Sequence, residues 1–227
     1  MTVPEPASAR SLPPWWAVLI VAIAIAGLAF AIGRFSTFGA AGAATPPTSD
    51  SPEAGFARDM QVHHGQAVEM AMDIYRTTDN SDVRVLAYDI ATTQSAQKGE
   101  FYDWLVRWGL PQAGGPLMSW MSTADTAHHH GAATGGSAPS EADLMAQMGM
   151  ATTAEIAQMR AETGTAADCT FLGLMIRHHQ GALPMAQALL QLGHDPRALT
   201  VAQGVINTQS AEIDLMTSLR AGLSCPS

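Results

Sequence analysis

The feature that most constrains the fold is an internal repeat of a two-helix unit. One copy begins at Phe56 and reads FARDMQVHHGQAVEMA, and the other begins at Phe171 and reads FLGLMIRHHQGALPMA, so the two are offset by 115 residues. The same offset pairs Gln94-Ser95-Ala96 with Gln209-Ser210-Ala211 without a gap. Repeated units that cannot bury their apolar faces alone pack against one another. The repeat therefore predicts an all-α four-helix bundle assembled from two helical hairpins.

Capping signals indicate where the long helices begin and end. Ser51-Pro52-Glu53 and Asp195-Pro196 each read as an N-cap followed by proline at the first helical position. Gly109-Leu110-Pro111 and Gly193 are typical of helix ends. We expect long helices at about 51–76, 81–108, 168–193 and 195–222.

The connector between the two repeats is rich in methionine and histidine and less regular. Thr152 and Glu155 have the spacing of a capping box. A short turn of helix is expected at about 117–121, and two short helices at about 140–148 and 153–162. The folded part, 51–225, then divides into a first repeat at about 51–110, the connector at 111–165 and a second repeat at about 166–225.

An uncharged apolar run near the N-terminus predicts one transmembrane helix before the bundle. The run extends from Trp15 to Gly33 and is followed by Arg34, which is enough to cross a hydrocarbon core of roughly 30 Å. We expect a tail at 1–14, an anchor at 15–35 and a flexible linker at 36–50. A cleaved signal peptide is the alternative, with the small residues at 39–44 as a cleavage region.

Charge and cysteine content limit the partners and the compartment. Beyond Ser36 the chain has nine Lys and Arg against nineteen Asp and Glu, which disfavours a nucleic-acid partner.

Cys169 and Cys225 are the only cysteines. An antiparallel bundle brings the start of the third helix beside the end of the fourth, so we expect a disulfide between them. This places the bundle on the extracytoplasmic side of a cell membrane, or, if the anchor is cleaved, outside the cell.

The repeated residues form one face of each helix. At ~100° per residue they all fall within about 80° of Met60, whereas Gly65 and Glu69 point the other way. This face carries two imidazoles and two thioethers in each copy. The candidate metal ligands are His63, His64, His178, His179, Met60, Met70, Met175 and Met185.

Two interpretations of this face stay open. A buried methionine is usually a core residue, and a lone buried histidine usually has a hydrogen-bond partner. Four buried imidazoles, however, cost solvation free energy unless each has a partner, and a metal ion would provide one. Thioether and imidazole ligands together favour copper, and Cu(I) over Cu(II), whereas zinc prefers cysteine, histidine and carboxylate. A di-iron site is disfavoured because the chain has no Glu-x-x-His motif.

The connector supplies further candidate ligands. A His-His-His stretch in a loop can bind metal loosely or can be accidental. These accessory candidates are Met118, Met121, His128, His129, His130, Met145, Met148 and Met150.

The stretch at 178–182 (His-His-Gln-Gly-Ala), with Phe171 and Met175 before it and the copy at His63-His64, resembles the domain-of-unknown-function 305 family. The Met-rich segment at 145–159 strengthens the resemblance. It implies a ferritin-like four-helix bundle that is exported or membrane-anchored. Some members are associated with periplasmic copper binding, which suggests the paired histidines and matched methionines as ligands here.

The resemblance covers about 56–223, and the chain departs from the family pattern in two places. Pro184 stands where the first copy has Glu69 and predicts a kink before Met185. The fourth helix keeps the family's Gln209, Glu212, Ile213 and Met216. The second helix has Gln94, Gln97, Lys98 and Phe101 instead. The two halves are therefore not expected to bind metal identically.

Three classes of function remain after these considerations. The favoured one is a non-enzymatic, membrane-anchored protein that sequesters or delivers copper. The second is a structural or accessory subunit of a membrane complex, in which the histidines are core residues only. The third and least favoured is a metal-dependent oxidase. A membrane-protein partner and a homo-oligomer both stay open.

Overall fold

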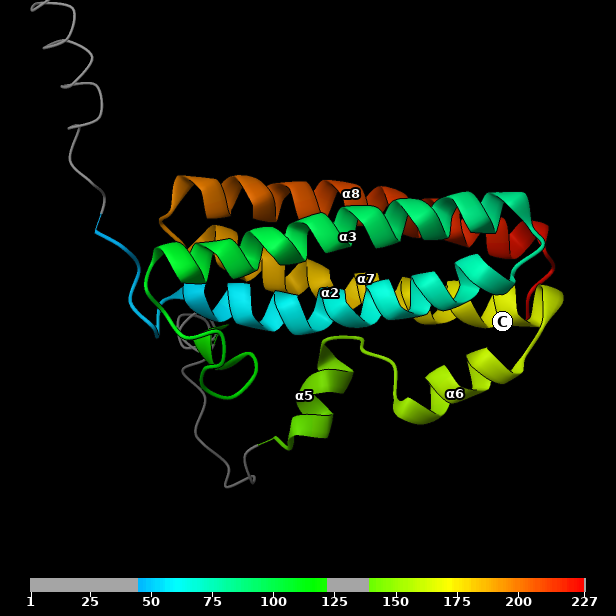
Figure 1. Ribbon diagram of the computed structural model, residues 1–227, viewed down its shortest axis with the longest axis horizontal. Coiled ribbons are helices and arrows are strands. Elements are labelled where there is room, and N and C mark those ends of the chain that lie inside the picture. Colours follow the sequence, from blue (N-terminus) through cyan, green and yellow to red (C-terminus); the bar gives the residue numbers. More distant parts are fainter. Residues whose placement is uncertain (1–44, 122–138, 227) are drawn as a thin grey trace, which may run out of the picture. The chain divides into compact units, whose positions relative to one another are not determined.

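The computed structural model describes residues 45–121 and 139–226, and the chain from Pro46 onward forms one compact unit. Every regular element in these residues is helical, which confirms the all-α prediction (Figure 1). The elements in chain order are α2 (Pro52–Thr77), α3 (Ser81–Arg107), the 3₁₀ turn η1 (Ser119–Met121), α5 (Glu141–Gln147), α6 (Thr153–Ala161), α7 (Gly164–Leu192) and α8 (Pro196–Gly222).

Side-chain caps begin most of these helices. The Ser51 hydroxyl accepts from the Ala54 N–H, and the Asn80 and Asp195 side chains each accept from two N–H groups at the next helix start. Capping therefore fixes α2, α3 and α8 close to where the sequence predicts them. The capping box of Thr152 and Glu155 is also present.

Helix α7 differs from the sequence-based expectation. It begins at Gly164, a full turn before Asp168, because the intervening small residues continue the helix and Asp168 is a buried residue within it. The short helical turn expected at 117–121 is the 3₁₀ turn η1. Pro184 lies inside α7, which stays helical to Leu192, and the Met185 side chain after it is fully buried.

The four long helices pack as two hairpins, with α2 against α3 and α7, and α7 against α8. The short helices α5 and α6 lie along one side, next to α2 and α7 (Figure 1). An ion pair between Glu100 and Arg197, at 2.6 Å, joins α3 to α8. A disulfide between Cys169 and Cys225, with the Cα atoms 5.5 Å apart, joins the start of α7 to the end of α8, as expected.

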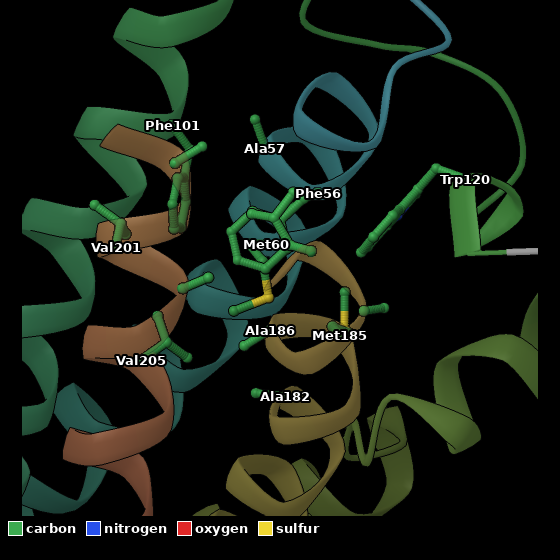
Figure 2. Packing of buried hydrophobic residues seen from close by; sticks show 14 of the residues in the cluster. Phe56, Ala57, Met60, Phe101, Trp120, Ala182, Met185, Ala186, Val201 and Val205 are labelled. Carbon is green, nitrogen blue, oxygen red and sulfur yellow. The ribbon is translucent and has the colours of Figure 1, made fainter. Parts of the chain in front are cut away.

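The apolar core consists of two clusters that the repeat relates to each other. The first cluster includes Phe56, Met60, Phe101, Met185, Val201 and Val205 (Figure 2). The second includes their counterparts at an offset of 115 residues, Phe171, Met175, Met216, Met70, Leu86 and Ile90. The duplication therefore extends from the sequence to the packing, and each half of the core draws residues from all four helices.

The connector is held to the bundle by buried polar contacts. The Asp59 carboxylate accepts from the Met118 N–H and from the Trp120 Nε1–H, both at 2.8 Å. The Gln66 amide exchanges two hydrogen bonds with the backbone of Ala151, at 2.7 and 2.8 Å. These contacts fix the segment that carries Met145, Met148 and Met150 across α2 and α7.

The predicted anchor at 15–35 and the His128–His130 loop lie outside the described residues. Between 45 and 121 and between 139 and 226, no helix is long and apolar enough to cross a membrane.

Candidate metal centre

A layer of polar side chains separates the two apolar clusters. Along each long helix, the polar positions fall between residues of one cluster and residues of the other. The members of this layer are His63 and His64 on α2, Gln94 on α3, His178 and His179 on α7, and Gln209 on α8. All four imidazoles are 0% exposed and both amides are 2% exposed. The predicted histidine set is therefore brought together at the centre of the bundle.

The imidazoles of the two repeats meet across the bundle. The rings of His63 and His178 lie 3.7 Å apart between centroids, with an angle of 34° between their planes. Within each pair the rings are further apart, at 6.1 Å for His63 and His64 and at 6.3 Å for His178 and His179.

Oxygen acceptors determine the protonation of three of the four rings. His63 Nε2 lies 2.9 Å from the Met148 carbonyl oxygen. His64 Nε2 lies 2.8 Å from Gln97 Oε1, and His179 Nε2 lies 2.7 Å from Glu212 Oε2. Because these oxygens accept hydrogen bonds, each Nε2 carries a proton, and in the neutral ring Nδ1 then carries the free lone pair. That tautomer presents Nδ1 as a metal ligand.

Many polar atoms of the layer have no protein partner. These atoms are Nδ1 of all four histidines, Nε2 of His178, and both amide atoms of Gln94 and Gln209. A buried polar group without a partner typically costs about 1 to 3 kcal/mol. Such a concentration is unusual for a packed core, in which nearly all buried polar groups are hydrogen-bonded. The layer is therefore chemically suited to a ligand that accepts several lone pairs.

Burial favours the neutral form of His63, His64 and His178. It lowers the pKa of His63 to about 4 and that of His64 to about 3, and it lowers the pKa of His178 well below its usual value. Repulsion among neighbouring imidazoles acts in the same direction, as does the Lys98 ammonium for His64. At neutral pH these three rings are in the uncharged form that metal binding requires.

The eight core candidates include four methionines that flank this layer in pairs. Met60 and Met185 share the first apolar cluster, and Met70 and Met175 share the second. All four are fully buried. Figure 2 shows the sulfur atoms of Met60 and Met185 within the side chains of the first cluster. The methionines fill the core in this structure, and they also place soft sulfur donors on both sides of the histidines.

The five accessory methionines all lie in or against the first apolar cluster. Met148 and Met150 belong to the first apolar cluster, and the partly buried Met118, Met121 and Met145 pack against it. Among the residues that the structure describes, no three His, Cys, Asp or Glu side chains are arranged to hold a metal ion by themselves.

Sequence reasoning did not assign a role to four groups at this centre. They are the amides of Gln94 and Gln209, and the acceptors Gln97 and Glu212. Gln94 and Gln209 are identical in the repeat, and Gln97 and Glu212 occupy matching positions at the same offset of 115 residues. The family pattern marks all four positions and the mismatch between Gln97 and Glu212 predicts unequal halves, but only the structure shows that these two side chains bond to His64 and His179.

The fold and the centre define a class of duplicated helical bundles with paired histidines between methionine-containing cores. The sequence profile of the family called Domain of unknown function (DUF305) matches residues 53–220, so the chain belongs to the DUF305 family. The resemblance stated from the sequence is therefore confirmed.

Several solved structures are similar to this chain. A DUF305 protein from Streptomyces coelicolor, which carries the description of a secreted protein, is 36% identical over 78% of this chain and 96% of its own, with a TM-score of 0.67. A DUF305 fragment from Deinococcus radiodurans is 30% identical over 77% of this chain and 97% of its own, with a TM-score of 0.59. CopM in a Cu(I)-bound form shares the fold at 20% identity, over 76% of this chain and 96% of its own, with a TM-score of 0.54. None of the curated proteins matches the sequence.

Proposed function

We propose that this protein binds copper outside the cytoplasm, with Cu(I) preferred over Cu(II), and sequesters the ion or delivers it to a partner. The observation that carries the proposal is the set of four buried imidazoles with unpartnered Nδ1 atoms. In this proposal the ligands are His63, His64, His178 and His179, joined by the methionine pairs Met60–Met185 and Met70–Met175.

The chemistry of the donors supports copper over other metals. Neutral imidazole and thioether suit Cu(I), which tolerates low coordination numbers and soft ligands. The only two cysteines form a disulfide, so thiolate ligands of the kind that structural zinc prefers are not available. CopM, which shares the fold, has been crystallised with Cu(I) and with Cu(II).

Two observations support a location outside the cytoplasm. The disulfide between Cys169 and Cys225 suits an oxidising compartment. The Streptomyces coelicolor relative carries the description of a secreted protein. We propose that residues 15–35 anchor the bundle to the cell membrane from its outer side, with 36–50 as the linker.

An anaerobic titration with Cu(I) against a chromophoric chelator tests the proposal on the full chain in mild detergent. The variant His63→Gln/His64→Gln/His178→Gln/His179→Gln removes the imidazoles and keeps polar side chains of similar size. We expect tight binding by the unmodified chain and its loss in this variant. His194→Gln, which changes an exposed histidine at the start of α8, serves as the matched control and should bind as the unmodified chain does.

Two results would contradict the proposal. Equal binding by the unmodified chain and a folded four-histidine variant would move the site to other residues, His128–His130 among them. Absence of binding by both would favour the structural-subunit interpretation, in which the layer only positions the helices. Circular dichroism of each variant establishes that the bundle has folded.

A further inference from the structure

The two halves of the histidine layer have equivalent geometry but different charge. His64 on α2 bonds to a residue 33 positions later on α3, and His179 on α7 bonds to a residue 33 positions later on α8. In the first half that residue is the neutral Gln97, and in the second it is Glu212. The hydrogen bonds are otherwise alike, at 2.8 and 2.7 Å. The two repeats therefore have the same hydrogen bond at this position, but the side chain that accepts it is a neutral amide in one repeat and a carboxylate in the other.

The Glu212 carboxylate strengthens His179 as a ligand. A carboxylate that accepts the N–H of an imidazole orients the ring and increases the electron density at the opposite nitrogen. The Glu212 side chain is only 14% exposed and the His179 side chain is fully buried, so water screens this contact weakly. A cation bound at His179 Nδ1 would also have a negative charge one imidazole away.

The first half has the opposite electrostatic character. Lys98 follows Gln97, and its ammonium lies beside α2 at Gly65, where its Nζ is 3.4 Å from the position that a Cβ atom would take. Gly65 is the residue after His64. The equivalent of Lys98 in the second half is Ile213, a partly buried apolar side chain. A cation at the first half therefore meets a neutral amide and a nearby positive charge.

The inner histidines differ in the same direction. His63 Nε2 is engaged by the Met148 carbonyl, whereas both ring nitrogens of His178 lack a partner. A neutral imidazole offers one lone pair, so each half has two ring-nitrogen donors, but His178 can present either nitrogen to a metal ion whereas His63 can present only Nδ1.

From these differences we infer that the two halves bind copper unequally, with the tighter binding at the His178–His179 half and Glu212 as the residue that positions and polarises His179. The first half, with Gln97 and Lys98, binds more weakly and fills later. This inference rests on the proposed function and assigns an order of loading to it.

A pair of reciprocal variants tests the inference in the same Cu(I) titration of the full chain. Glu212→Gln removes the charge and keeps the shape and the hydrogen-bond acceptor. Loss of such a supporting group typically lowers metal affinity by about 10- to 100-fold, so we expect that decrease in the tightest binding event. Asp214→Asn, an exposed change on the same helix, removes the same charge and should leave the affinity unchanged.

The reciprocal variant is Gln97→Glu/Lys98→Ile, which gives the first half the chemistry of the second. We expect it to raise the affinity of the weaker event by about 10-fold or more. A purely structural role for Glu212 would not produce this gain. The ¹⁵N shifts of the His179 ring in Glu212→Gln should show that the tautomer is retained.

Paired histidine variants give the outcome that separates this inference from the proposed function. We expect His178→Gln/His179→Gln to abolish the tightest event and His63→Gln/His64→Gln to preserve it. Equal losses in the two variants, or an unchanged affinity in Glu212→Gln, would overturn the unequal halves and leave copper binding intact. Absence of tight binding in the unmodified chain would instead overturn the proposed function.

Discussion

His63 and His178 occupy equivalent positions in the two repeats, and their rings lie against each other with centroids 3.7 Å apart. Equivalent residues of two copies related by a two-fold rotation can touch only where they lie on the axis. The approximate two-fold axis of the bundle therefore passes through this pair. The apolar clusters lie on either side of it, so the least satisfied polar groups of the core are concentrated where the repeats meet.

The stability of the metal-free protein should fall on mild acidification. The folded state holds His63 and His64 at pKa values of about 4 and about 3, whereas an unfolded histidine has a pKa of about 6.5. Below pH ~6.5 the unfolded chain binds protons that the folded chain excludes, so stability decreases as pH falls. The full stability is present only above the pKa of the unfolded histidines.

Urea denaturation between about pH 6.5 and pH 4.5 measures this effect, since unfolded carboxylates titrate mainly below that range. The four-histidine variant should show a much weaker pH dependence over the same range. A slope equal to that of the unmodified chain would mean that other groups carry the effect.

Replacing the two unpartnered amides with methionine should stabilise the metal-free bundle. Gln94 and Gln209 are 2% exposed, and none of their amide atoms has a partner. Methionine has a similar shape without the polar atoms, so each change should add about 1 to 3 kcal/mol to the free energy of unfolding. Gln203→Met on the exposed face of α8 should change it by less than about 0.5 kcal/mol. A loss of stability in Gln94→Met would show that the amide is satisfied by bound solvent.

The disulfide should contribute about as much to stability as a large buried side chain. It closes a loop of 56 residues between Cys169 and Cys225, and the chain-entropy estimate for such a loop is about 4 kcal/mol. Cys169→Ser/Cys225→Ser should lower the free energy of unfolding by about that amount, as measured by urea denaturation. Because the disulfide joins the start of α7 to the end of α8, away from the histidines, histidine-dependent copper binding should survive at urea concentrations below the unfolding midpoint.

The sequence was sufficient to predict the helices, the duplication and the histidine layer, because each leaves a signal in residue type or spacing. Caps identified the start of α8, and the repeat identified His63 and His178 as counterparts. The contacts of the layer were harder to predict. The mismatch between Gln97 and Glu212 is visible in the sequence, but the sequence does not show that both side chains bond to the neighbouring histidines.

Contacts made by backbone groups are even harder to predict from the sequence. The acceptor for His63 is the carbonyl oxygen of Met148, which the connector brings across the bundle from 85 residues away. The early start of α7 was missed for a related reason, since Asp168 resembles an N-cap and only tertiary packing shows that it is buried within the helix.

Methionine-to-leucine variants separate the two roles of the core sulfur atoms. Leucine fills nearly the same volume without a donor atom, and such exchanges usually cost less than about 1.5 kcal/mol. Met60→Leu/Met185→Leu changes the first cluster, and Met70→Leu/Met175→Leu changes the second. If the thioethers bind copper, both variants should keep a near-normal unfolding free energy and lose Cu(I) affinity, by an amount that the chelator titration measures.

Alanine variants supply the control for packing. Met60→Ala and its counterpart Met175→Ala should each destabilise the bundle by about 2 to 5 kcal/mol, because both side chains are fully buried. Unchanged Cu(I) affinity in both leucine variants, together with these losses in the alanine variants, would assign the four methionines to packing alone. The ligand set would then reduce to the imidazoles, which favour Cu(I) over Cu(II) less strongly than a set that includes thioethers.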